Sequence, residues 1–316
     1  MIDKRLLKSY YNSFNTKAFI CLYPGMTCSE KPIRAHSIQN SKVFDLLSDK
    51  DHLVSIQQIT NKSHAPVPSF GLIGRNKASV FEGLCQHHDK SLFKPIDDSD
   101  FEVDDKEQLF LLAYRSVLKE LHASMTRAIK IQEGYFSKAH LGLCAKDAPS
   151  MEGEFALQNI MDAFDTYEYK IGFDNAFLAG NYDYLTHQIF KIETDRATVA
   201  CSQLFSIDSF QFRDTVPRVL MNIFPVNNKL TYAIFSSTKD ESSQVNDYLF
   251  KCLRSNNVSV RNYEISKLII RNSDNFFISP LHFSTWSESK KSKVLQHCAD
   301  TVFKDVEQDD VDFYLF

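Results

Sequence analysis

Hydrophobic residues recur at helical spacing in several stretches of the second half of the chain. One stretch predicts an amphipathic helix over about 107–132. Its apolar positions, most of them three to five residues apart, are Leu109, Leu112, Val117, Leu118 and Leu121. A second predicts a helix over about 154–170, with Phe155, Ile160, Met161 and Phe164 on one face. Further helices are predicted over about 241–254 and 285–303.

From about residue 186, shorter runs of strand-forming residues appear. Residues 188–192 and 197–201 predict strands, and 275–280 predicts a strand that ends at Pro280. Residues 219–224 and 230–235 flank Asn227-Asn228. Paired asparagines tolerate the positive φ of tight turns, so this stretch predicts a β-hairpin. Helices and strands together predict an α+β domain over 108–316, whose activity its sequence does not indicate.

An acidic run separates this region from the start of the chain. Asp and Glu dominate residues 96–107, which predicts a linker over 97–107 between a first module, 1–96, and the second domain. A length of 316 residues is consistent with about two domains of roughly 150 residues each. Hydrophobic residues at 43% and charged residues at 24% exclude a disordered or low-complexity chain.

No run of 18 consecutive apolar residues occurs, and Met1–Arg5 does not lead into a signal-peptide pattern. We therefore expect a cytoplasmic protein with no membrane partner. In a reducing compartment, clustered cysteines indicate metal ligands before disulfides, and the chain has seven. Cys144, Cys201, Cys252 and Cys298 are scattered singly and are expected in the core.

Net charge is unevenly distributed along the chain. Residues 1–95 carry 13 Lys and Arg against 7 Asp and Glu, whereas residues 96–316 carry 23 against 33. A basic module suits an anionic partner such as nucleic acid, although many ordinary surfaces reach the same excess.

The first module contains two pairs of metal-binding residues. Cys21 and Cys28 flank a Pro24-Gly25 turn, and Cys85 and His88 are three residues apart, so that at a helix N-terminus they share one face. Together they supply the four ligands of a structural Zn²⁺ site. The alternative is that the cysteines only fill core space, because free thiols are often buried without any ligand role.

These pairs, with His36 between them, resemble the HNH, or ββα-metal, nuclease motif on a zinc-stabilised treble-clef scaffold. The resemblance covers about residues 18–96. It implies an endonuclease that hydrolyses phosphodiester bonds, with His36 as the general base and Asp89 as the ligand of a catalytic Mg²⁺ or Mn²⁺. Histidine has a near-neutral pKa, and carboxylate oxygen suits these hard cations.

Basic residues flank the predicted site. We expect Arg34, Arg75, Lys77 and Lys90 to contact the phosphates of nucleic acid, DNA rather than RNA, although a solvated charged surface explains them as well. Nucleases of this kind often belong to bacterial systems of phage defence, which the resemblance suggests as a context.

One position favours a different class of function. The residue before the histidine is commonly acidic or histidine in the motif, and here it is Ala35. The alternative is therefore a non-catalytic zinc module that binds nucleic acid or a protein. In either case the second domain is expected to bind a partner protein or to form a homo-oligomer.

Overall fold

The computed structural model describes residues 15–60, 66–144, 150–207, 216–301 and 313–316. The chain forms two compact units, and each combines stretches that are distant in sequence. Unit 1 consists of Met1–Ala35, Phe81–Asp98 and Val117–Tyr182, and unit 2 of His36–Val80, Ser99–Ser116 and Asp183–Phe316. The fold is α+β, as the sequence predicts.

Unit 2 is built on a seven-stranded sheet with the order β3-β2-β9-β6-β7-β8-β5. Neighbouring strands pair antiparallel. The strands are β2 (His52–Thr60), β3 (Pro66–Gly74), β5 (Leu185–Glu193), β6 (Val199–Ser206), β7 (Arg218–Asn227), β8 (Leu230–Thr238) and β9 (Phe276–Ile278). The central strands β6, β7 and β8 are buried along nearly their whole length, which explains their continuous apolar runs.

The predicted hairpin is formed by β7 and β8, with Leu220 opposite Ser236 and Asn227 opposite Leu230. Its turn is made differently from the expectation. Neither Asn227 nor Asn228 has a positive φ. The Asn227 side chain instead accepts a hydrogen bond from the backbone amide of Lys229 at 2.8 Å, which closes the turn.

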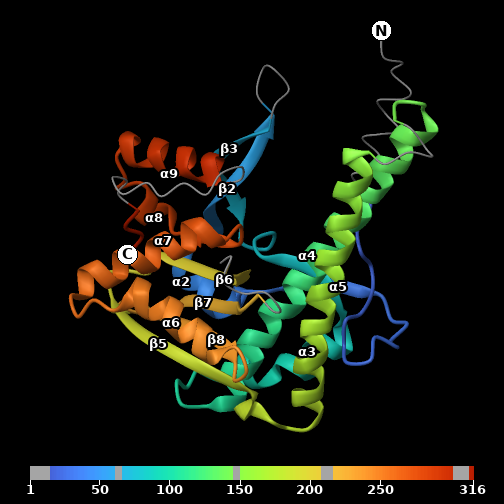
Figure 1. Cartoon of the computed structure of the whole chain (residues 1–316). Coiled ribbons are helices and arrows are strands. Elements are labelled where there is room, and N and C mark those ends of the chain that lie inside the picture. The colour runs from blue at the N-terminus through green and yellow to red at the C-terminus, as the bar shows by residue number, and fades with distance from the viewer. Residues whose placement is uncertain (1–14, 61–65, 145–149, 208–215, 302–312) are drawn as a thin grey trace. The chain divides into compact units, whose positions relative to one another are not determined.

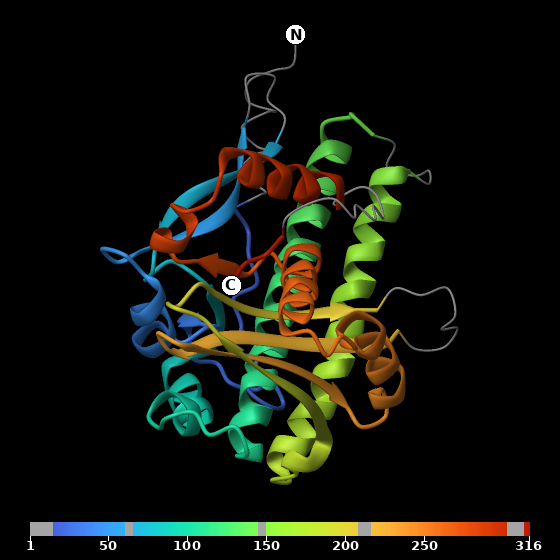
Figure 2. The same ribbon diagram turned by 90° about the vertical axis from the view of Figure 1, so that its left-hand side faces the viewer.

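Helices cover both faces of the sheet of unit 2 (Figure 1, Figure 2). On one face α6 (Ser242–Leu253), α7 (Val258–Asn272) and α9 (Glu288–Thr301) bury Leu249, Ile269 and Val294. On the other face η1 (Asn40–Phe44), α2 (Asp45–Leu47) and the first turns of α4 (Lys106–His140) contribute Phe44, Leu47 and Leu109. The remaining short elements are η2 (Tyr182–Tyr184) and α8 (Pro280–Phe283).

The acidic stretch predicted as a linker has defined structure. α3 (Gln86–Asp97) ends at its first residue, and α4 begins at Lys106, near its end. The Asp105 side chain accepts hydrogen bonds from the amides of Glu107 and Gln108, at 2.9 and 3.1 Å, and so caps α4. Phe101 packs edge-on against Phe224 and Tyr232 in unit 2. Phe101 therefore anchors this acidic segment by packing against two aromatic residues of the sheet.

Unit 1 contains helix α3, most of α4, and α5 (Met151–Leu178). It also contains a short sheet of β1 (Pro32–His36) and β4 (Val80–Cys85), except for the end residues His36 and Val80, which belong to unit 2. Both long helices extend beyond their predicted ranges. α4 and α5 lie side by side (Figure 1, Figure 2), joined by a hydrogen bond from Arg127 Nε to Asn159 Oδ1 at 3.0 Å. No helix in the described ranges is long and apolar enough to cross a membrane.

The apolar residues that predicted α5 do not form its buried face. Phe155, Ile160, Met161 and Phe164 are all exposed, whereas Ala156, Asn159, Ala163 and Phe173 are buried. The helix is thus confirmed, but the four residues expected to form its apolar face are exposed.

Candidate metal centre

The first two candidate ligands lie in the loop before β1. Gly25 and Met26 both have positive φ, +81° and +50°, and the Met26 amide donates to the Tyr23 carbonyl at 2.9 Å. This reverses the chain between Cys21 and Cys28. The Leu22 amide donates to the Gly83 carbonyl at 2.7 Å, which attaches the loop to β4.

The other two ligands come from the junction of β4 and α3. Cys85 is the last residue of β4 and the N-cap of α3, and its side chain makes no capping hydrogen bond. His88 follows in the first turn of the helix. A strand that leads directly into a helix thus presents Sγ and the imidazole to the same point, as the spacing predicts.

The four side chains form a cluster that could bind a metal ion, with all ligand atoms within 4.8 Å of one another. His88 Nδ1 lies 3.4 Å from Cys21 Sγ and 3.3 Å from Cys85 Sγ, and the Sγ atoms of Cys28 and Cys85 are 3.9 Å apart. A tetrahedral zinc ion with ordinary bond lengths has S···S edges of about 3.8 Å and S···N edges of about 3.6 Å. The cluster is therefore consistent with a structural zinc site.

The surroundings shift the pKa values of three of the four ligand groups. Burial raises the pKa of the Cys21 thiol to about 11, so without metal this group is protonated at neutral pH. Burial also acts on Cys85, but hydrogen bonds from the His88 amide and from the neighbouring thiols outweigh it and lower its pKa. Burial and His87 lower the pKa of His88, which leaves the neutral imidazole that a metal requires.

Two residues outside the ligand set complete the centre. The ring of Tyr23 stacks on His88 and touches Phe177 edge-on. Lys170 of α5 is fully buried, and its Nζ lies 2.5 Å from Asp174 Oδ2. Burial lowers the pKa of Lys170, while Asp174 and Cys21 favour its charged form. A divalent ion with three thiolate ligands carries a net negative charge. The ammonium group of Lys170 partly neutralises this charge.

Sequence reasoning did not identify Tyr23 or Lys170. An available signal for Lys170 was a lysine with an aspartate four residues later, inside a helix whose neighbouring turns are apolar. For Tyr23, the only signal was its place within the turn between two candidate ligands.

His36, the predicted general base, is the last residue of β1 and is partly buried. Its Nδ1 lies 2.9 Å from the Ala78 carbonyl oxygen, and its ring packs edge-on against Phe44. A carbonyl only accepts, so Nδ1 carries the proton and the neutral ring has its lone pair at Nε2. Asp89, the predicted metal ligand, lies in the first turn of α3 and is partly buried. His36 belongs to unit 2 and Asp89 to unit 1.

The basic residues fall into different surroundings. A cavity of about 1030 Å³ beside the cluster is lined by Cys28, Cys85 and His88 together with Lys31, Lys90 and Lys94. Arg34 is exposed on β1. Lys77 is exposed in a turn of unit 2, and the Arg75 guanidinium in the same turn forms ion pairs with Asp45 and Asp51. Of the four residues predicted to contact phosphates, only Lys90 lines this cavity beside the metal cluster.

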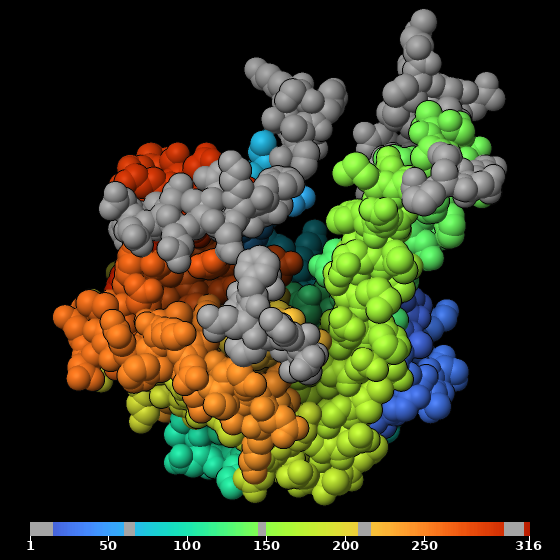
Figure 3. Space-filling model, in the orientation of Figure 1, coloured from blue at the N-terminus to red at the C-terminus, as the bar shows by residue number. Residues whose placement is uncertain are grey.

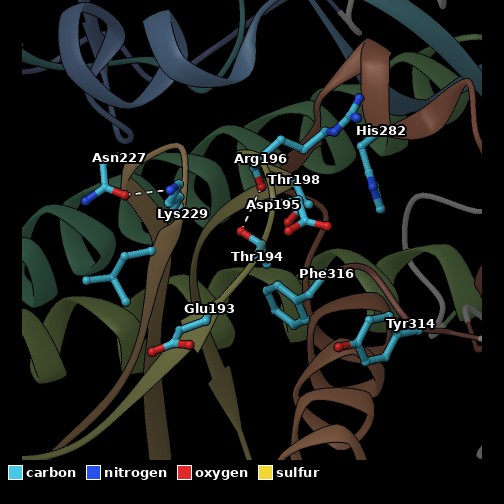
Figure 4. A pocket seen from close by; sticks show the side chains of 11 residues that line it. Glu193, Thr194, Asp195, Arg196, Thr198, Asn227, Lys229, His282, Tyr314 and Phe316 are labelled. Carbon is cyan, nitrogen blue, oxygen red and sulfur yellow. Dashed lines mark hydrogen bonds between the residues drawn. The ribbon is translucent and has the colours of Figure 1, made fainter.

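Unit 2 has a separate cavity of about 1060 Å³ that no sequence prediction concerns (Figure 4). Glu193, Asp195, Arg196 and Lys229 line it, with His282 and the rings of Tyr314 and Phe316. Its lining therefore includes two carboxylates and two basic side chains. Within the described part of the chain, the only group of three or more metal-ligating side chains is the Cys21, Cys28, Cys85 and His88 cluster of unit 1.

Comparison with known proteins identifies no relative: no protein-family model, no curated protein and no solved structure matches this chain.

Proposed function

We propose that the chain is a metal-dependent endonuclease of the HNH type, in which Cys21, Cys28, Cys85 and His88 hold a structural zinc ion. The observation that carries the proposal is the convergence of these four side chains where β4 leads into α3. β1 pairs with β4, so two strands and a helix accompany the cluster. Two strands and a helix are the parts of a ββα-metal module, and in this chain η1, α2, β2 and β3 of unit 2 lie between its two strands.

His36 is the proposed base. With Nδ1 facing the Ala78 carbonyl, Nε2 can take a proton from water as that water attacks phosphorus. Asp89 is the proposed ligand of a second cation, Mg²⁺ or Mn²⁺, which would neutralise charge on the phosphate oxygens. Lys31, Lys90 and Lys94 around the cavity beside the zinc cluster would hold neighbouring phosphates, and DNA is the proposed substrate.

Ala35 favours a second function. Its side chain is buried and offers no ligand atom next to His36. The alternative is a zinc module that binds nucleic acid without cutting it, in which the same lysines supply the affinity.

Cleavage assays separate the two functions. Purified full chain is incubated with supercoiled plasmid and with single-stranded RNA, in Mg²⁺, in Mn²⁺ and in EDTA. We expect nicking of the plasmid that needs the added cation and is lost in His36→Ala and Asp89→Ala. His52→Ala is the matched control, since His52 is exposed at the start of β2 and has no role in the proposal. Equal cutting by all variants, or no cutting by any, contradicts the nuclease proposal. A retained gel shift would then favour the binding module.

A further inference from the structure

Helix α5 exposes an unusual amount of apolar surface. It carries eight of the eighteen large hydrophobic residues that are exposed in the described ranges. They are Met151, Phe155, Leu157, Ile160, Met161, Phe164, Ile171 and Leu178. Figure 3 shows α5, in yellow-green, at the surface of the viewed face along much of its length. Exposed apolar residues that gather on one element often mark an interaction site.

The spacing of these residues fits a helical partner. Leu157, Phe164, Ile171 and Leu178 are each seven residues apart, and their exposed fractions are 59%, 50%, 38% and 65%. Ile160 and Met161 lie three and four residues after the first of them. A seven-residue repeat keeps one face of a helix against a second helix, here over about 32 Å. We call the face with this repeat the outer face of α5.

The outer face is distinct from the face that α5 already buries. Ala156, Ala163 and Phe173 are buried on the inner side, and Asn159 of that side accepts the hydrogen bond from Arg127 of α4. α5 therefore has two apolar faces, of which the described residues of the chain cover one. A helix of this kind packs between two neighbours.

Charge identifies the kind of neighbour. α5 contains six carboxylates and one basic residue, Lys170, and Lys170 is fully buried. Asp165 and Glu168 are exposed beside Phe164 on the outer face. The outer face is thus apolar at its centre and acidic along one edge, with no exposed lysine or arginine on the helix.

We propose that the outer face of α5 is a docking surface for an amphipathic helix of another protein, with apolar residues in a seven-residue repeat and lysine or arginine at their sides. A second copy of α5 packed antiparallel would bring this acidic edge against itself, which disfavours such a homodimer through this face. An anionic membrane would repel the same carboxylates.

Peptide binding tests the proposal. The probe is a fluorescent 28-residue helix with Leu at the core positions of four heptads and Lys at the flanking positions, and the control peptide has Glu in place of Lys. Anisotropy with the full chain is expected to show binding of the Lys peptide at least tenfold tighter than the Glu peptide, weakening as salt rises. The double variant Phe164→Gln/Ile171→Gln should lose at least tenfold in affinity. Phe250→Gln, at a more exposed site on α6, should lose none.

The substituted residues are exposed, so the variants should melt at the wild-type temperature, which separates loss of binding from loss of fold. Four results would overturn the proposal. Equal binding of both peptides, or no binding of either, contradicts a basic amphipathic helix as the partner. If analytical ultracentrifugation shows a dimer, and the Phe164→Gln/Ile171→Gln variant is a monomer, the face binds a second copy of the chain. Flotation with phosphatidylserine vesicles assigns it to lipid. Affinity that rises tenfold in Lys4→Glu/Arg5→Glu/Lys8→Glu assigns it to the chain's own basic N-terminal residues.

Discussion

The ring of Tyr23 lies face to face on the imidazole of His88, with centroids 3.8 Å apart and planes inclined by 8°. This stacking fixes the rotation of the imidazole, and in the observed rotation Nδ1 faces the Sγ atoms of Cys21 and Cys85. A group that orients a metal ligand without touching the metal typically changes affinity by about 10- to 100-fold when removed.

Tyr23→Ala is therefore expected to weaken zinc binding by about tenfold, because the imidazole loses its orientation. Competition with a chromogenic chelator measures the change. Tyr23→Phe is the matched control and should bind zinc as the wild type does, since the ring is kept. Equal affinities for all three proteins would show that the stacking has no part in ligand orientation.

Loss of a ligand should be more severe. Cys28→Ser and Cys85→Ser are expected to reduce bound zinc from about one ion per chain to a small fraction, because thiolates supply three of the four ligands. Elemental analysis after gel filtration measures the content. Cys144→Ser, outside the cluster, should retain the full amount. Retention of zinc by Cys85→Ser would place the ion elsewhere.

The Lys170–Asp174 pair should matter for folding. Lys170→Met removes the ammonium from a buried carboxylate and is expected to lower the free energy of unfolding by about 3 kcal/mol. Denaturant titration measures it. Lys267→Met, which breaks the more exposed pair with Glu264, should cost less than about 1 kcal/mol. If Lys170→Met/Asp174→Leu is as unstable as Lys170→Met alone, the ion pair is not the cause.

Stability should fall in mild acid. Burial lowers the pKa of His187 and of His282 to about 4, whereas in the unfolded chain each titrates near 6.5. Between these values the unfolded state binds the proton and the folded state does not, so stability decreases as pH falls from about 6.5 to about 4. Each histidine contributes up to about 1.4 kcal/mol per pH unit.

His187→Gln should flatten this pH dependence, and His52→Gln, at an exposed histidine, should leave it unchanged. Denaturant midpoints measured at several pH values provide the test. An identical slope in wild type and His187→Gln would mean that His187 has the same pKa in the folded and the unfolded protein.

The features that could be predicted from the sequence are mostly those set by residues close together in the chain. The β7–β8 hairpin and helices α6 and α9 follow from short-range periodicity, and Cys85 and His88 share a helix end because their spacing dictates it. The convergence of Cys21 and Cys28 with that pair could be inferred only because thiol and imidazole have few other reasons to be grouped this way. Ligand chemistry carried information that hydrophobic pattern did not.

The features that the sequence did not predict depend on tertiary contacts. The apolar residues of α5 predicted a helix correctly but not which side would be buried, because a helix with two apolar faces has no single amphipathic pattern. Phe101 was hidden in an acidic run, and its packing on Phe224 depends on a strand more than 100 residues away. The assembly of unit 1 from three separate stretches has no local signal at all.

The central claim is that three thiolates and one imidazole hold zinc in this chain. Zinc K-edge X-ray absorption on the purified full-length protein tests it most directly. We predict a four-coordinate shell with three sulfur atoms at about 2.3 Å and one nitrogen atom at about 2.0 Å, changed in both Cys28→Ser and Cys85→Ser. A shell of oxygen and nitrogen atoms alone, or a spectrum that neither substitution alters, would contradict it.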